Sequence, residues 1–122
     1  MKASLDESQP IFLQIAQMIM DEIIDGHLQE EEKIPSENEL SQFFNINRAT
    51  VRNGLQSLVD TELIYKQRGI GMFVKKGAKK KLLMERQKNF SADYLLPMLK
   101  EAKRIGLNSE AVIEMIDEEA KK

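Results

Sequence analysis

The sequence predicts a mainly helical protein that carries one small β-hairpin and ends in a short helical tail. Before residue 62, apolar residues recur at spacings of three and four in three separate segments, which is the period of an amphipathic helix. Two short runs of β-branched and aromatic residues then flank a pair of glycines, as in a hairpin. The helical period returns from residue 82 onward, after a lysine-rich stretch. The expected order is therefore three helices, a hairpin and a helical tail.

Composition narrows the class of protein before any motif is considered. The chain has 122 residues, of which 42% are hydrophobic and 31% charged, as in an ordinary soluble domain. It has no cysteine and a single histidine, His27, which removes disulfides, thiolate catalysis and any site that needs two imidazoles. The sequence also lacks metal-ligand spacings, a nucleophile with its base and a phosphate loop. We therefore expect no enzyme activity, no metal and no cofactor.

The longest uncharged stretch near the start, from Ser8 to Met20, does not predict a membrane segment. It has 13 residues and three glutamines, so it is too short and too polar to span a bilayer. It follows two acidic residues and lacks the basic leader of a signal peptide. We expect a cytoplasmic protein.

The first helix is expected between Pro10 and Gly26. Proline suits a first helical turn, and glycine is a typical stop. The acidic residues 30–32 and Lys33 that follow are interpreted as a solvated connection to the next helix. One face of the helix collects the apolar residues Phe12, Ile15, Ile19 and Ile23.

A capping box predicts where the second helix begins. Ser36-Glu37-Asn38-Glu39 has the S-x-x-E form, in which the serine hydroxyl and the glutamate carboxylate accept hydrogen bonds from each other's backbone N–H groups. Three apolar side chains of this helix are expected to be buried: Leu40, Phe43 and Phe44.

The third helix follows a short turn at residues 45–46, with Asn47 as its N-cap and an end near Thr61. Its apolar stripe consists of Val51, Leu55 and Leu58. A different face carries Arg48, Ala49, Arg52 and Gln56. Burial of the stripe therefore turns the two arginines outward.

A hairpin is expected directly after this helix. Residues 63–65 and 72–74 are the two β-prone runs, and between them Gly69 and Gly71 permit the positive φ values of a tight turn. The result is a two-stranded wing beside the third helix.

Charge is distributed unevenly along a chain whose formal net charge is −2. Residues 45–81 contain nine Lys or Arg and two acidic residues, a net charge of +7, and the rest of the chain carries −9. Phosphate neutralisation depends on the local patch and not on the total charge. The basic segment is therefore a candidate polyanion-binding surface, and its alternative is a chance cluster joined to a lysine-rich linker.

The residues after the hairpin predict a helical tail. The lysine-rich residues 75–81 are interpreted as a solvated linker, and residues 82–88 as the first helical segment. Ser91 is the expected cap of a second segment, in which Pro97 introduces a kink or break and Gly106 a stop. A last helix opens at Ser109 and places three apolar residues on one side: Val112, Ile113 and Ile116.

These tail helices have too little apolar partner surface in their own chain, so a second subunit is their expected cover. The tail is also expected to be too short to enclose a ligand pocket of the usual roughly 300 to 1,000 Å³. We divide the chain into a first domain of residues 1–77 and a dimerisation tail of residues 78–122.

Helix, tight turn, helix and hairpin, with a preceding helix to complete the core, form a winged helix-turn-helix. The sequence resembles the DNA-binding domain of the GntR family of bacterial transcriptional regulators. The similar segments are PIFLQIAQMIMDEIIDGHL (10–28), IPSENEL (34–40), NRATVRNGLQSL (47–58) and ELIYKQRGIGMFV (62–74). Residues 91–118 further resemble the tail of the YtrA-like subfamily, so the resemblance covers nearly the whole chain.

The resemblance implies that the third helix is the recognition helix in the DNA major groove. Arg48 and Arg52 would then pair with guanine edges or nearby phosphates. Asn47 and Thr50 would contact phosphate oxygens, and Ala49 a thymine methyl group. Arg68 and Gly69 stand at the wing tip that approaches DNA. The expected set is completed by Ser36 and Asn38 at the start of the second helix.

Four residues depart from the family pattern. Asn38 replaces a frequent basic residue, Ala49 a common hydroxyl residue, and Glu62 a glycine that commonly precedes the wing. Gly54 lies inside the recognition helix, where glycine costs roughly 1 kcal/mol relative to alanine. These departures are expected to alter the operator sequence and not the fold.

The resemblance also implies the partners: double-stranded operator DNA with two-fold symmetry, a second copy of the chain in a homodimer, and a small-molecule effector that the sequence does not identify. Repression is the expected mode, because steric occlusion needs only tight binding. The alternative is a winged helix that contacts an acidic protein without recognising DNA. A steep salt dependence of operator binding distinguishes the two.

Overall fold

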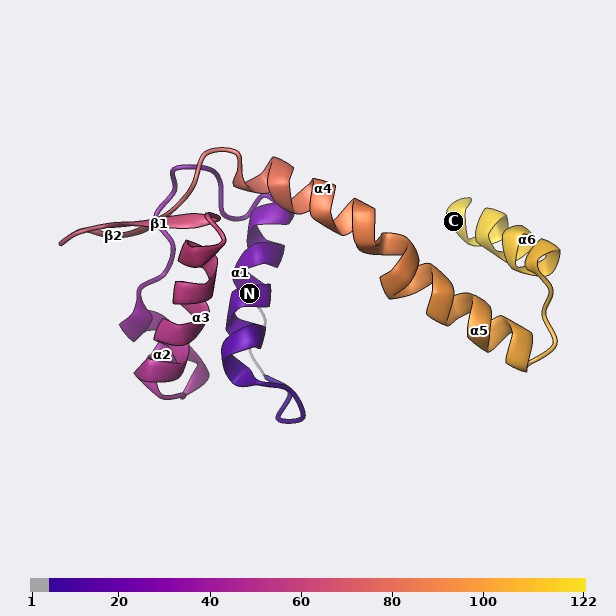
Figure 1. The fold of residues 1–122 in the computed structure, drawn as a ribbon, viewed down its shortest axis with the longest axis horizontal. Helices are drawn as coiled ribbons and strands as arrows, with labels where there is room; N and C mark the ends of the chain where they lie inside the picture. The colour runs from indigo at the N-terminus through magenta and orange to yellow at the C-terminus, as the bar shows by residue number, and fades with distance from the viewer. Residues whose placement is uncertain (1–4) are drawn as a thin grey trace. The chain divides into compact units, whose positions relative to one another are not determined.

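A computed structural model describes residues 5–122 and divides the chain into two compact units, one ending at Leu83 and one running from Met84 to Lys122. Figure 1 shows the order of the elements along the chain. The first unit contains one short antiparallel sheet and is otherwise helical, as predicted. The elements are α1 (Ile11–Ile24), α2 (Glu37–Phe44), α3 (Arg48–Asp60), β1 (Ile64–Gln67), β2 (Gly71–Val74), α4 (Ala78–Phe90), the π-helical turn η1 (Ser91–Leu95), α5 (Leu96–Arg104) and α6 (Ser109–Ala120).

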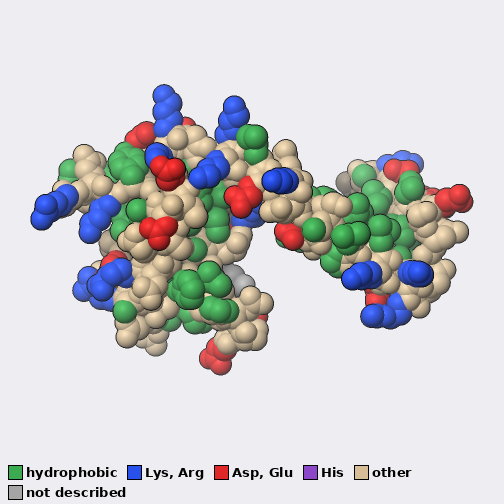
Figure 2. Space-filling view, in the orientation of Figure 1, with side chains coloured by type: hydrophobic (Ala, Val, Ile, Leu, Met, Phe, Trp, Pro, Cys, Tyr) green, Lys and Arg blue, Asp and Glu red, His purple; other side chains and the backbone are tan. Residues whose placement is uncertain are grey.

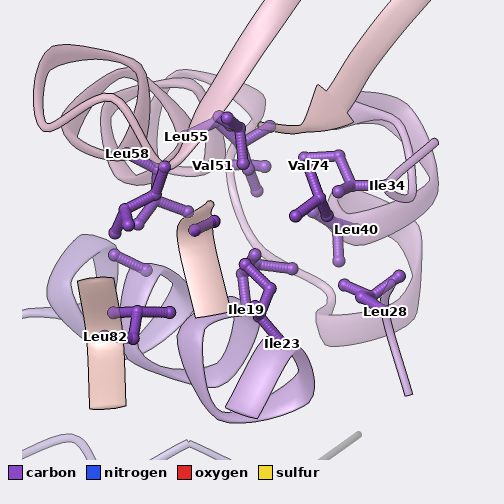
Figure 3. Packing of buried hydrophobic residues seen from close by; sticks show 14 residues of the cluster. Ile19, Ile23, Leu28, Ile34, Leu40, Val51, Leu55, Leu58, Val74 and Leu82 are labelled. Atoms are coloured by element: carbon purple, nitrogen blue, oxygen red, sulfur yellow. The ribbon is translucent and has the colours of Figure 1, made fainter. Parts of the chain in front are cut away.

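The core of the first unit is built from the predicted helical stripes. Figure 3 shows side chains of α1, α2, α3 and β2 converging on one apolar interior. Burying each such side chain contributes roughly 1.5–3 kcal/mol relative to leaving it exposed. The most deeply buried members include Ile15, Ile19, Ile23, Leu40, Val51, Leu55, Leu58, Ile64 and Val74. Phe12, which was expected on the buried face of α1, is 37% exposed instead, because it lies at the outer edge of that face.

The capping box at the start of α2 is confirmed. The Glu39 amide donates to the Ser36 hydroxyl at 3.0 Å, and the Ser36 amide donates to the Glu39 carboxylate at 2.9 Å. These bonds from Ser36 lower the pKa of Glu39. The expectation that Phe43 is buried is wrong, since its side chain is 57% exposed. Helix α2 has only eight residues and turns Leu40 inward, which leaves Phe43 outside, edge-on to the half-buried Phe44 at 4.8 Å.

The turn between α2 and α3 is short, as predicted. Asn45 adopts the left-handed conformation with φ +54°, and the Ile46 amide donates to the Ser41 carbonyl at 3.1 Å. Asn47 then caps α3, because its side-chain oxygen accepts a hydrogen bond from the Ala49 amide at 2.7 Å. The helix ends at Asp60, one residue before the expected Thr61.

Gly54 is important for helix packing, although glycine has a low helix propensity. It is buried on α3, and a Cβ atom there would lie 2.7 Å from the Phe12 carbonyl oxygen and 3.2 Å from the Ile15 Cβ. Real Cβ atoms do not approach backbone oxygens so closely. The glycine therefore permits α1 and α3 to pack closely, and this contact offsets the roughly 1 kcal/mol that glycine costs in helix propensity.

The predicted wing is confirmed as an antiparallel pair in which Ile64 faces Val74 and Gln67 faces Gly71. Its loop contains Gly69, at φ +79°. The acidic connection after α1 is not merely solvated, contrary to expectation. The Glu31 amide donates to the Val74 carbonyl at 2.7 Å and the Ile34 amide to the Met72 carbonyl at 2.9 Å. Residues 31–34 therefore lie along the free edge of β2 and bond to its backbone, with an isolated antiparallel bridge between Lys33 and Phe73.

The interpretation of residues 75–81 as a solvated linker is wrong for their second half. Helix α4 begins at Ala78, and both Ala78 and Leu82 are buried in the core of the first unit. The Lys81 ammonium donates to the Thr61 carbonyl at 2.5 Å, at the C-terminal end of α3. A cation is favourable there because helix C-termini expose unpaired carbonyl oxygens. The lysines thus include a C-terminal cap of α3.

The second unit is helical, but one predicted boundary is wrong. Ser91 does not cap a new helix; it lies in η1, which follows α4 directly. Pro97 lacks an N–H donor, and it sits at the first positions of α5 immediately after this wide turn. Helix α5 ends before Gly106, which has φ +82°, as expected. Helix α6 begins at Ser109, as expected, and Asn108 caps it by accepting a hydrogen bond from the Ala111 amide.

Candidate nucleic-acid interface

The two arginines that the sequence singles out lie on the N-terminal half of α3 and point into solvent. Each side chain is 60% exposed, whereas Val51 and Leu55 between and beyond them are buried. Arg48 is the first residue of the helix, and Arg52 lies one turn further on. Burial of the apolar stripe thus turns both guanidinium groups outward, as the sequence predicts.

A carboxylate that sequence reasoning missed holds this pair. Glu37, in the first turn of α2, accepts hydrogen bonds from Arg52 Nε at 3.1 Å and Arg52 Nη2 at 2.8 Å. Arg48 Nε lies 3.4 Å from the same carboxylate. Hydrogen bonding and charge from Arg52, with a smaller contribution from Arg48, lower the pKa of Glu37, and the pKa of Arg52 is raised in turn. The signal available in the sequence was an acidic first turn one short helix upstream of two exposed arginines.

The polar residues around the arginines are partly engaged in helix capping. The side-chain oxygen of Asn47 is bonded to the Ala49 amide, so its NH₂ group is the part available to a phosphate. The Ser36 oxygen accepts from the Glu39 amide in the same way, and the Ser36 side chain also hydrogen-bonds the Glu39 carboxylate, so Ser36 is engaged mainly in the cap. Asn38 and Ala49 are exposed, and Thr50 is half-buried.

Arg68 and Gly69 lie in the loop of the wing, as predicted, and both are exposed. A Cβ atom on Gly69 would meet nothing within 4 Å, so its glycine character serves the positive φ of the turn. Glu62 also has a positive φ, +61°, which explains why glycine is common at this point in the family pattern. Its carboxylate pairs with the Lys75 ammonium at 3.1 Å, and this contact lowers the pKa of Glu62.

Positive side chains gather where the hairpin and α3 present their exposed faces. Figure 2 shows Lys and Arg side chains projecting at the left edge of the first unit, beside the hairpin. The surface that the hairpin and α3 expose is therefore a cationic one.

Within residues 5–122, no group of three or more His, Cys, Asp or Glu residues is placed to hold a metal ion. None of the helices in the same range has the length and apolar character needed to cross a membrane.

The fold and this face define a winged helix-turn-helix protein, with α2 and α3 as the helical pair and β1–β2 as the wing. The sequence pattern of the family described as "Bacterial regulatory proteins, gntR family" matches residues 12–74. The chain belongs to this family. The expectation from resemblance is thereby confirmed at the level of the family, and this is a family of regulatory proteins and not of enzymes.

Individual relatives agree with this assignment. The HTH-type transcriptional repressor NagR of Bacillus subtilis (strain 168) is 42% identical over 67 residues, which make up 55% of this chain and 28% of NagR. A putative GntR-family regulator from Bacteroides thetaiotaomicron has a similar structure, with a TM-score of 0.72 and 32% identity over 91% of this chain and 96% of that one. The DNA-binding domain of AraR in complex with operator ORX1 matches 57% of this chain and 86% of that domain, with 38% identity and a TM-score of 0.53.

The relatives differ in length. The chain spans only about a quarter of the length of the curated relatives that it matches. It spans nearly all of the solved regulator from Bacteroides thetaiotaomicron.

Proposed function

We propose that this chain is a sequence-specific DNA-binding regulator of transcription that represses its target by occupying a two-fold symmetric operator as a homodimer. The observation that carries the proposal is the exposed pair Arg48 and Arg52 on the first turns of α3, held in place by Glu37. The N-terminal part of a recognition helix is the part that reaches base edges in the major groove. A guanidinium can pair bidentately with guanine O6 and N7 there.

The other residues have supporting roles in this proposal. Asn47, Thr50, Ser36 and Asn38 surround the N-termini of α2 and α3, where backbone N–H groups and short polar side chains favour phosphate oxygens. Ala49 offers a methyl group to a thymine. Arg68 and Gly69 bring the wing tip to the backbone or to the adjacent minor groove.

The homodimer is supported by the apolar surface of the second unit. Its helices leave large apolar side chains in solvent, among them Tyr94 at 67%, Leu96 at 51% and Ile113 at 58% exposed. Monomeric proteins rarely expose contiguous apolar patches of this kind. A two-fold dimer would cover one such surface with its copy. The tail's resemblance to the YtrA-like subfamily supports the same arrangement, and we assign the chain to that subfamily and to the cytoplasm as part of this proposal.

Sedimentation of the full chain tests the dimer separately from DNA binding. Ile113→Glu places a charge on the exposed apolar surface of α6 and is expected to shift the protein towards the monomer. Lys100→Glu, on α5, is the matched control that adds negative charge without removing apolar surface, and it is expected to leave the dimer intact. A wild-type protein that sediments as a monomer throughout the micromolar range would contradict the dimer.

A small-molecule effector belongs to the same proposal. The tail is expected to be too short to enclose a ligand pocket, and its last two helices form an open groove instead of an enclosed cavity. A groove of about 470 Å³ lies between α5 and α6 within the second unit. Its lining is almost entirely apolar and includes Met98, Ala102, Ile105, Val112 and Ile116. The groove is open, so the second subunit and an effector are both candidates to fill it.

Protein contact without DNA recognition is the competing function of the same cationic face. Selection of duplexes from random DNA at moderate salt decides between the two. Our proposal expects enrichment of a two-fold symmetric motif and a steep fall of affinity with salt, because phosphate contacts release counterions. Failure to enrich any motif would favour the protein-contact function.

A further inference from the structure

Lys33 is not among the DNA-contacting residues proposed above. Its backbone nevertheless lies between two groups of them, those of the wing and those at the start of α2. An isolated antiparallel bridge pairs Lys33 with Phe73 of β2. Hydrogen bonds flank this pair, from the Ile34 amide to the Met72 carbonyl at 2.9 Å and from the Val74 amide to the Glu32 carbonyl at 3.0 Å. Lys33 therefore lies at the edge of the wing, beside β2 and three residues before the N-cap of α2.

The stem of Lys33 lies against the backbone of Gly71, the first residue of β2 after the wing loop. A Cβ atom on Gly71 would lie 2.6 Å from the Lys33 Cε and 3.6 Å from its Nζ. The lysine side chain thus occupies the space in which a Cβ atom at Gly71 would stand, and the φ of +147° at Gly71 is a conformation that other residues rarely adopt. The end of the lysine stem therefore lies along the wing, beside the first residue of β2.

The ammonium at the end of this stem is uncommitted. Within residues 5–122, no hydrogen bond or ion pair engages the Lys33 side chain, and the residue is exposed. Other cations of the same unit are paired: Arg52 with Glu37, and Lys75 with Glu62. The charge of Lys33 nevertheless acts on α2, because it contributes to the lowered pKa of Glu39 in the first turn of that helix.

We propose that Lys33 is a DNA phosphate contact that joins the footprint of the wing to that of α2. This inference rests on the proposed DNA-binding function. A lysine interacts with phosphate as a point charge, so the contact adds affinity for any duplex without selecting its sequence. Lys33 would contact a DNA phosphate that lies between those contacted by Arg68 in the wing loop and those contacted by Ser36 at the start of α2.

The test uses the full chain and four substitutions, of which Arg52→Ala probes the proposed DNA recognition itself. Lys33→Met keeps an unbranched stem over Gly71 and removes the charge, whereas Lys33→Arg keeps the charge. Lys103→Ala removes one charge from an exposed position on α5 and serves as the control. Affinity is measured between 50 and 200 mM salt for the duplex recovered by selection and for a scrambled duplex, and thermal unfolding verifies that each variant is folded.

We expect Lys33→Met to weaken binding to both duplexes by the same factor and to reduce the slope of log K against log salt by about 0.9. The ratio of wild-type to variant affinity should then shrink about 3.5-fold from 50 to 200 mM salt. Lys33→Arg and Lys103→Ala should retain the wild-type slope.

An unchanged slope in Lys33→Met, together with loss of discrimination in Arg52→Ala, would overturn the role of Lys33 while leaving the proposed function intact. A Lys33→Met variant that loses affinity for the selected duplex alone would also overturn it, because a phosphate contact is blind to sequence. Absence of binding by the wild-type chain to either duplex would overturn the proposed function and this inference with it.

Discussion

The carboxylate of Glu37 accepts two hydrogen bonds from one edge of the Arg52 guanidinium, one from Nε at 3.1 Å and one from Nη2 at 2.8 Å. The contact joins the first turn of α2 to the second turn of α3, 15 residues apart in the chain. It restricts the rotamers of an arginine that would otherwise be mobile on an exposed helix face. In the proposed DNA-binding function, α3 would therefore present an arginine whose position is already restricted, and Glu37 would offset one positive charge of the surface.

Glu37→Gln tests this positioning role. The amide cannot hold the guanidinium as a charged acceptor, and the DNA-facing surface gains one net positive charge. We expect affinity for scrambled DNA to rise and the difference between specific and non-specific binding to fall by about 1 to 3 kcal/mol, the size of one bidentate base contact. Competition binding with the selected and scrambled duplexes measures both quantities. If the variant retains full discrimination, Glu37 has no role in positioning the arginines.

The same pair predicts a pH dependence of stability. The pKa of Glu37 in the folded protein is lowered by Arg52, so ionised Glu37 stabilises the fold above the ordinary carboxyl pKa, and this stabilisation is lost as the pH falls through the lowered pKa. Exposed pairs of this kind contribute less than about 1 kcal/mol. We expect the free energy of unfolding of Glu37→Gln to lie slightly below wild type at pH 7 and to match it near pH 3. Denaturant titrations at the two pH values provide the comparison, and a difference that grows on acidification would have the wrong sign.

Gly54→Ala is predicted to destabilise the protein although alanine is the better helix former. The new methyl group would lie 2.7 Å from the Phe12 carbonyl oxygen and would push α1 away from α3. Overpacking of this kind costs about 1–3 kcal/mol. Asn53→Ala, at the neighbouring exposed position of α3, is the matched control and should not lower the free energy of unfolding. Greater stability of Gly54→Ala in urea would show that the two helices are free to separate at no cost.

Leu82→Ala tests whether the start of α4 is part of the core. The Leu82 side chain is only 3% exposed, so its truncation leaves a cavity, and such changes cost about 2–5 kcal/mol. Lys80→Ala, two residues earlier on the exposed side of the same helix, should change the free energy of unfolding by less than about 0.5 kcal/mol. Equal thermal stability of both variants would restore the interpretation of this segment as a solvated linker.

Much of the fold could be predicted from the sequence because its signals are local. The capping box at Ser36 and Glu39, the N-cap at Asn47 and the glycine in the wing loop each fix the backbone within a few residues. The stripe Val51, Leu55 and Leu58 determines by its burial which face carries the arginines. These features follow from helix and turn geometry alone.

The features that the sequence did not predict depend on contacts between distant segments. The role of Gly54 depends on how closely α1 approaches, and the place of Glu37 depends on the turn that brings α2 beside α3. In the sequence, nothing distinguishes Lys81 from the lysines beside it. Its capping role depends on the Thr61 carbonyl, which the fold brings within hydrogen-bonding distance. Phe43 has the composition of a core residue, yet an eight-residue helix has too narrow an inner face to bury it.

Selection of duplexes from random DNA with wild-type protein and with Arg48→Ala in parallel tests the central claim most directly. Our account predicts that the wild type enriches a two-fold symmetric motif, and that Arg48→Ala loses about 1 to 3 kcal/mol of discrimination at one base pair of each half-site. The variant should keep most of its affinity for unselected DNA. Enrichment of the same motif to the same extent by both proteins would contradict the claim that the exposed arginines of α3 recognise the operator.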